Sequence, residues 1–312
     1  GGFLPIGYAV HDHGKIDPNL GTESEFRSML AEFHAGGNGP PLKVILDLPF
    51  AMVGAGHPWS ARPQEFQNYF RPWNAVDPAD NIGKGPVDVP YGQIDSDWGM
   101  GIVNAANGME KEETTYRAIR DDIVFHLMDR FDIDGFRYDS AQDLAPEFWA
   151  KILAQFRTRY GEKKPDFVHV GEVFIYPAPK TWQRNSPDYV NRSAGIGMDG
   201  IYDFALIHRI QKVFGEGEDA QGLAQTMKET ARHFDEPERL MASFDGYEDP
   251  TLLSLAKDGH GKERLFLATV FLLTINRVPF LYSGNECGMD YSEPGVLFEE
   301  KVDAGYLARF KT

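Results

Sequence analysis

The sequence predicts an α/β protein built on a parallel sheet. Short apolar runs alternate with longer segments of helical period along most of the 312 residues, which is the pattern of strands joined by crossover helices. Hydrophobic residues make up 42% of the chain, enough to bury a sizeable core. The length also lies within the range in which an α/β barrel forms one domain, so an enzyme-sized globular protein is expected.

Helices and strands are predicted in alternation through the first half of the chain. A helix begins at Thr22, where Thr22 and Glu25 have the spacing of a capping box, and ends at Gly36–Gly37. A strand over 43–50 follows; a helix over about 114–131 leads into a strand over 134–139, and a helix over 146–160 leads into a strand over 166–174. The faces expected to be buried carry Tyr116, Ile119, Ile123 and Leu127 in the second helix and Phe148, Ile152, Phe156 and Tyr160 in the third.

The second half continues this alternation with three more strands. We expect strands over 200–206, 239–244 and 278–284, a weaker helix over 219–234 and an apolar helix over 263–275. Between 57 and 112 the rhythm breaks, because this stretch is rich in Gly, Pro, Asp, Asn and aromatic residues and shows no convincing helix. It is too long for an ordinary loop and is interpreted as a small irregular subdomain inserted after the first predicted strand.

Composition excludes several classes of function. The formal net charge is −16 and the acidic residues are scattered, which argues against binding nucleic acid and favours a neutral or cationic ligand. No apolar run is long enough to span a bilayer, and the N-terminal residues lack a signal-peptide pattern. The single cysteine, Cys287, can form neither an internal disulfide nor a cysteine-built metal site, so localisation stays open.

Charged residues gather where the predicted strands end. Asp47 lies within the first strand, Arg137 and Asp139 end the second, and Glu172 lies near the end of the third. Arg137 and Asp139 are two residues apart, so their side chains share one face of the sheet. Asp249 follows the strand over 239–244 after a short turn. The carboxyl-terminal edge of such a sheet is where active sites form, although a structural salt bridge or a set of loop caps would also account for these residues.

Five segments together resemble one family. They are "GYAVHDHGKIDPNLGT" (7–22), "VILDLPFAMVGAGHPW" (44–59), "DGFRYDSAQDL" (134–144), "HVGEVF" (169–174) and "SFDGYEDP" (243–250). They are similar to the signature segments of the α-amylase family of retaining α-glucoside hydrolases and transglycosylases, glycoside hydrolase family 13. The resemblance covers nearly the whole chain and implies a TIM (β/α)8 barrel that acts on α-linked glucans or maltooligosaccharides.

The resemblance also implies roles for individual residues. Asp139 would be the nucleophile, Glu172 the general acid and base, and Asp249 the acid that holds sugar hydroxyls and favours the transition state. The residues that would bind substrate are Tyr8, Asp12, Arg137, Met52 and Glu248.

Retaining chemistry explains why two carboxyls and a cation are needed. One ionised carboxylate attacks the anomeric carbon, and one protonated carboxyl, about 5 Å away, donates to the leaving oxygen. Arg137 is expected to lower the pKa of Asp139 and so to keep the nucleophile ionised.

Two departures from the family pattern affect specificity and metal binding. Ala51-Met52 and Tyr247-Glu248 each replace an Asn-His pair whose histidine donates hydrogen bonds to the reacting sugar. We therefore expect altered specificity or a reduced rate. The first of these asparagines also serves the family's frequent calcium site, so calcium is doubtful and no cofactor is predicted. "HDH" (11–13) lacks a third spaced ligand for zinc.

Relative to the family, the chain begins after the second barrel strand. We expect a partial catalytic barrel over 1–56 and 113–312, with 57–112 inserted after the third barrel strand, and the two missing strands supplied by a longer polypeptide or a partner. Hydrolysis is the favoured activity. Transglycosylation on the same substrates and a non-catalytic carbohydrate-binding or partner-binding role remain alternatives.

Overall fold

The structure is a computed structural model, and it describes residues 10–37, 39–49, 52–54, 57–58, 100–102, 116–144, 146–174, 186–191, 197–245, 250–289 and 302–311. Most of the predicted insertion over 57–112 therefore lies outside the described residues. The chain forms two compact units, Gly1–Phe174 with Arg192–Asp199 and Ile175–Asn191 with Gly200–Thr312. Each unit is described by itself.

Helix α1 (Glu23–Ala35) begins and ends where the sequence predicts. The Thr22 hydroxyl accepts from the Glu25 amide at 3.3 Å, and the Glu25 carboxylate accepts from the Thr22 amide at 2.8 Å, which completes the capping box. Gly36 ends the helix with φ 80°, and a Cβ there would lie 2.7 Å from the Gly39 carbonyl oxygen. The predicted stop is confirmed, because glycine tolerates both the left-handed conformation and the close approach.

Three parallel strands form the sheet of the first unit. Strand β4 (Gly135–Asp139) lies between β1 (Ile45–Pro49) and β5 (Val168–Gly171). Asp47 is the register partner of Arg137, and Pro49 is the register partner of Asp139. A separate antiparallel pair joins β2 (Met52–Gly54) to β3 (Met100–Ile102), so the segment expected to be irregular contains one short strand near its end.

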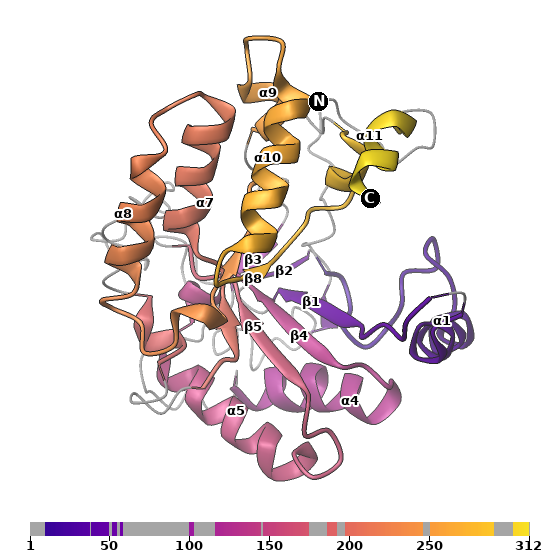
Figure 1. Ribbon diagram of the computed structural model, residues 1–312. Helices are drawn as coiled ribbons and strands as arrows, with labels where there is room; N and C mark the ends of the chain where they lie inside the picture. The colour runs from indigo at the N-terminus through magenta and orange to yellow at the C-terminus, as the bar shows by residue number, and fades with distance from the viewer. Residues whose placement is uncertain are drawn as a thin grey trace. The chain divides into compact units, whose positions relative to one another are not determined.

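Helices α4 (His126–Arg130) and α5 (Pro146–Tyr160) pack beside the sheet (Figure 1). The predicted helix over 114–131 is helical from residue 116, but a π-helical stretch over Ile119–Phe125 widens it before α4. All eight side chains predicted to be buried on these two helices are buried. Phe136 and Tyr138 of β4 contact Phe156 and Trp149 of α5, with ring centroids 6.4 and 4.6 Å apart. Because side chains alternate along a strand, Arg137 and Asp139 face the opposite side of the sheet.

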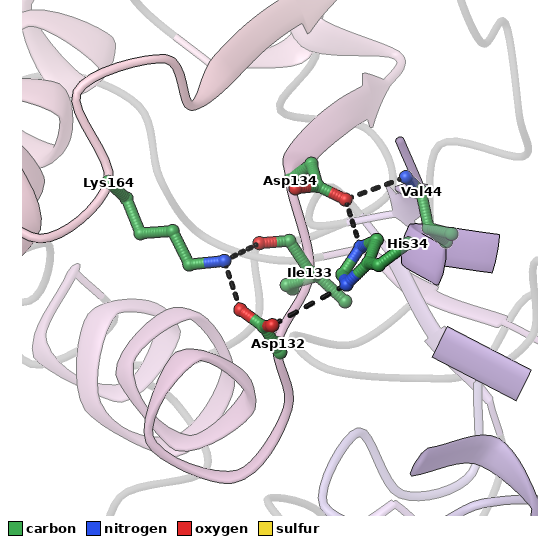
Figure 2. A network of polar contacts seen from close by, with 6 residues as sticks. All are labelled: His34, Val44, Asp132, Ile133, Asp134 and Lys164. Carbon is green, nitrogen blue, oxygen red and sulfur yellow. Dashed lines mark hydrogen bonds and ion pairs between the residues drawn. The ribbon is translucent and has the colours of Figure 1, made fainter. Parts of the chain in front are cut away.

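A polar network ties α1 to the start of β4 (Figure 2). His34, in the last turn of α1, lies 2.8 Å from the Asp134 carboxylate and 3.5 Å from that of Asp132. Asp134 also accepts from the Val44 amide at 2.8 Å, and Lys164 pairs with Asp132 from the other side. These contacts hold the N-terminal ends of β1 and β4 together, at the end of the sheet opposite to Asp139.

The second unit contains short strands between longer helices. Its strands are β6 (Gly200–Ile201), β7 (Met241–Ala242) and β8 (Val278–Pro279), of which β7 and β8 pair in parallel. Its helices are α7 (Phe204–Ile210), which continues as a π-helical turn over Gln211–Gly215, α8 (Gln221–Thr230), α9 (Leu252–Leu255), α10 (Gly261–Thr274) and α11 (Ala304–Phe310). Short 3-10 turns cover Ala141–Asp143 in the first unit and Pro187–Tyr189, Pro237–Arg239 and Asn285–Cys287 in the second.

The predicted strand over 200–206 is wrong beyond Ile201. Asp203 caps helix α7 instead, because its carboxylate accepts from the Leu206 amide at 3.0 Å. The same buried carboxylate accepts from Arg277 at 3.0 Å. The apolar side chains of α7 then join those of α10 in one core, which includes Leu206 and Leu272. In the part of the chain that is described, no helix is both long enough and apolar enough to cross a membrane.

Candidate active site

One guanidinium holds three carboxylates at the carboxyl-terminal edge of the first unit's sheet. The Nη1 atom of Arg137 donates to Asp139 at 2.6 Å and to Asp47 at 2.8 Å, and its Nη2 atom lies 3.0 Å from Glu172. Carboxylates bound to neighbouring nitrogens of one guanidinium are held within a few ångströms of each other. The structure therefore brings together three of the predicted site residues, Arg137, Asp139 and Glu172.

The strand register explains this convergence. Asp47 and Arg137 are register partners on β1 and β4, and Asp139 lies two residues further along the same face. Glu172 directly follows β5, and its amide donates to the Tyr138 carbonyl at 2.9 Å, so the backbone ladder runs on to Glu172. The Asp139 side chain is only 5% exposed, whereas the Asp47 side chain is 44% exposed. The cluster is thus closed around Asp139 and open to solvent at Asp47.

Ser140 binds Oε2 of the Glu172 carboxylate, whose other oxygen, Oε1, lies 3.0 Å from Arg137. Its amide donates to the Glu172 carboxylate at 3.0 Å, and the next amide, from Ala141, donates to the Glu172 carbonyl at 2.8 Å. Ser140 has φ 47°, and among the described residues it is the one non-glycine residue with a positive φ. A strained conformation directly after Asp139 is typical of functional sites, where surrounding contacts hold it in place.

The pKa of Asp139 corrects one expectation. Burial, followed by the charge of Glu172, raises the pKa of Asp139 to about 7, although Arg137 acts to lower it. Arg137 therefore has the predicted effect but does not decide the outcome, because removal from water and a second carboxylate outweigh one cation. Asp139 therefore keeps its proton up to about neutral pH.

Of the remaining predicted site residues, Asp12 is the one whose side chain the structure describes. Asp12 is half-buried, accepts from the Gly14 amide at 2.9 Å and pairs with Lys15 at 2.9 Å. Burial acts to raise the pKa of Asp12, but hydrogen bonds from Lys15 and Gly14 hold it below its usual range. Met52 belongs to β2, and only its backbone is described. Tyr8, Glu248 and Asp249 lie outside the described residues.

Metal binding has no support among the residues that the structure describes. They contain no group of three or more His, Cys, Asp or Glu side chains arranged to hold an ion. His13 of the "HDH" motif is buried and contacts His57 and the Pro49 carbonyl instead. Ala51 supplies no side-chain oxygen at the position where the family pattern has an asparagine.

Two features of the cluster do not follow from the sequence, the contact of Asp47 with Arg137 and the part played by Ser140. Asp47 was recognised as an acid at the sheet edge, but its contact with Arg137 follows only from the β1–β4 register. Ser140 carried no signal, because its role rests on its backbone conformation and amide rather than on its side chain. A charged residue directly opposite another on a neighbouring strand is the pattern that would have revealed the first.

The arrangement can support acid, base and nucleophilic chemistry. Two carboxyls lie beside a fixed cation, so one can attack an electrophilic carbon while the other donates a proton. Retaining glycosidases hold two such carboxyls about 5 Å apart, whereas inverting enzymes need a wider spacing that admits a water molecule.

Comparison with known proteins assigns a family. The family model for the alpha amylase catalytic domain matches residues 5–309. The intracellular maltogenic amylase of Bacillus subtilis is 26% identical over 294 residues, which are 91% of this chain and 43% of that protein. The cyclomaltodextrinase of Thermoanaerobacter pseudethanolicus is 25% identical over 286 residues, 90% of this chain and 45% of that protein. The chain thus spans less than half the length of these two relatives.

A solved structure supports the same fold. The alpha-amylase from Geobacillus thermoleovorans, solved with acarbose, superposes with a TM-score of 0.76 at 21% identity, covering 99% of this chain and 65% of that one. The chain therefore belongs to the alpha-amylase catalytic-domain family, whose fold is the TIM (β/α)8 barrel.

Proposed function

We propose that the chain carries the catalytic carboxyls of a retaining glycoside hydrolase that acts on α-linked glucans or maltooligosaccharides. The observation that carries this proposal is the binding of Asp139 and Glu172 to neighbouring nitrogens of Arg137. Names of the relatives, maltogenic amylase and cyclomaltodextrinase, support the substrate class.

The reaction proceeds in two displacements. Asp139 attacks the anomeric carbon while Glu172 gives its proton to the glycosidic oxygen, which leaves a glycosyl ester on Asp139. Glu172, now ionised, takes a proton from water, and the water oxygen displaces Asp139 from the sugar. The singly protonated pair is the form that can start this cycle, and Arg137 stabilises the charge that returns to Asp139.

The other residues complete the substrate site in this proposal. Asp249 is the third acid and holds sugar hydroxyls, with Glu248 beside it as an acceptor. Tyr8 is the platform under the reacting sugar, Asp12 supports the sugar site, and Met52 lines the site where a histidine donor is lost. Loss of two histidine donors predicts altered specificity or a slower rate than the family's usual pattern gives.

We further propose that residues 1–56 and 113–312 contribute to one barrel, with β1, β4 and β5 as its third, fourth and fifth strands. Residues 57–112 are an insertion after β1. No calcium is required. Chelation followed by addition of calcium tests the last point, because a rate that falls and then recovers would contradict it.

Product analysis after incubation with maltoheptaose tests the proposed function. Shorter sugars indicate hydrolysis, longer ones indicate transfer, and unchanged substrate supports a non-catalytic binding protein. Asp139→Asn is expected to abolish turnover, and a wild-type rate in this variant would remove the nucleophile assignment.

Azide separates the two carboxyl roles. With α-maltosyl fluoride as substrate, whose fluoride leaves without a proton, azide added to Glu172→Ala is expected to restore turnover and give an α-glycosyl azide, because it attacks the ester on Asp139. Added to Asp139→Ala, it would replace the nucleophile and give a β-glycosyl azide. The opposite pairing of variants and products would exchange the two assignments.

A further inference from the structure

Two buried histidines meet beside the end of β1. His13 is 8% exposed and His57 is 3% exposed. His13 Nε2 lies 3.2 Å from the Pro49 carbonyl oxygen, which can only accept, so this nitrogen carries the hydrogen. His13 Nδ1 is then an acceptor, and it lies 3.1 Å from His57 Nε2, which must donate. One carbonyl therefore sets the tautomers of both rings.

The position of that carbonyl links the pair to Asp139. On the β4 side of β1, the Val44 carbonyl accepts from the Asp134 amide at 2.9 Å. Backbone groups alternate between the two edges of a parallel strand, so the Pro49 carbonyl points to the edge away from β4. Because proline has no amide hydrogen, residue 49 leaves no backbone donor unpaired at that edge. Pro49 is also the register partner of Asp139, so His13 holds one edge of the strand whose other edge lies against Asp139.

The hydrogen bonds of this pair suit a neutral imidazole. Burial lowers the pKa of His13 to about 4, although the Pro49 carbonyl and the charge of Asp12 act to raise it. Asp12 also interacts with His57, so its carboxylate is the described charge that acts on both rings. His13 stays neutral around neutral pH, and the chain of donors from His57 to Pro49 stays intact.

We propose that His13 and His57 form a bridge that positions Asp139 for attack on the sugar. His13 is a positioning residue that acts through Pro49 and the β1–β4 ladder, and it does not touch the reacting atoms. The inference rests on the proposed function of Asp139 as the nucleophile. A structural role alone would affect stability without a selective effect on the chemical step.

Kinetics on maltoheptaose test the bridge. His13→Phe keeps the ring volume and removes both hydrogen bonds, and we expect kcat to fall about tenfold with KM little changed. His13→Gln retains a donor and an acceptor and is expected to recover most of the rate. His11→Phe is the matched control, because His11 lies two residues away and its side chain is exposed. Its kcat and KM are expected to equal those of wild type. Equal kcat values in His13→Phe and wild type would overturn the proposal.

A second readout works without turnover. Carbon-13 NMR of labelled aspartate follows the titration of Asp139, and His13→Phe is expected to move its midpoint by about half a pH unit or more, whereas His11→Phe leaves it in place. An unmoved midpoint in His13→Phe would refute the inference even if the wild-type protein cleaves no sugar, which would refute the proposed function separately. If His13→Phe does not fold, His57→Phe takes its place, because it removes the hydrogen bond to His13 Nδ1 and leaves the one from His13 to Pro49, and a wild-type midpoint there is equally contradictory.

Discussion

Replacing the buried Asp139 with asparagine should change how the protein's stability depends on pH. Burial, with the charge of Glu172 second, raises the pKa of Asp139 from 3.8 to about 7. The folded protein therefore binds this proton more tightly than the unfolded chain does. The resulting stabilisation is present in full below pH 3.8 and is lost as the pH rises through 7.

The size of the effect follows from the shift. Each pH unit between the two pKa values is worth about 1.4 kcal/mol, so ionising Asp139 in the folded state costs about 4 kcal/mol in all. Raising the pH from 5 to 8 removes about 3 kcal/mol of the stabilisation that the Asp139 proton provides. Asparagine does not ionise, and its amide oxygen can still accept from Arg137, so Asp139→Asn should lack this loss.

Urea denaturation at pH 5 and pH 8 measures the effect as a free energy of unfolding. We take the free energy of unfolding of Asp139→Asn minus that of wild type. This difference is expected to be about 3 kcal/mol larger at pH 8 than at pH 5. Asp47→Asn is the matched control, because Asp47 contacts the same guanidinium at 2.8 Å with a side chain that is 44% exposed. Its change between the two pH values is expected to stay under about 1 kcal/mol. If both variants gave the same small change, burial would not be what raises the pKa of Asp139.

Three further predictions concern the residues around the carboxyl pair and the first helix. Arg137→Lys replaces a planar fork with a point charge that cannot hold three carboxylates, so we expect kcat on maltoheptaose to fall about a hundredfold; a rate within twofold of wild type would be contradictory. Ser140→Val places a branched side chain at φ 47° and should lower the free energy of unfolding by about 2 kcal/mol, whereas Ser140→Gly should stay within about 0.5 kcal/mol of wild type in urea denaturation. Thr22→Ala removes the capping box and should cost about 1 kcal/mol, with Thr22→Ser close to wild type; equal melting temperatures for all three proteins would argue against the cap.

Local patterns made the first unit predictable. The Thr22–Glu25 capping box and Gly36 set both ends of α1 because each acts over a few residues of sequence. The helical period identified the buried faces of two helices, and the residues at the strand ends identified Asp139 and Glu172 as neighbours. Each of these inferences needs only the spacing of residues along one element or the order of elements along the chain.

Features that depend on distant partners were out of reach. Asp203 begins a helix inside an apolar run that reads as a strand, and its partner Arg277 lies 74 residues away. His13 and His57 are 44 residues apart in the sequence, and their spacing does not predict that the two rings are in contact. The direction in which the pKa of Asp139 shifts also depends on burial. The charges of neighbouring residues in the sequence do not show how deeply a side chain is buried.

Trapping the covalent intermediate tests the central claim most directly. In Glu172→Gln, α-maltosyl fluoride can still form the ester, because fluoride leaves without a proton, while its hydrolysis lacks a base. Peptide mass mapping is expected to find one maltosyl group on Asp139. A maltosyl group on any other residue, or an unlabelled protein while wild type turns the fluoride over, would contradict the account.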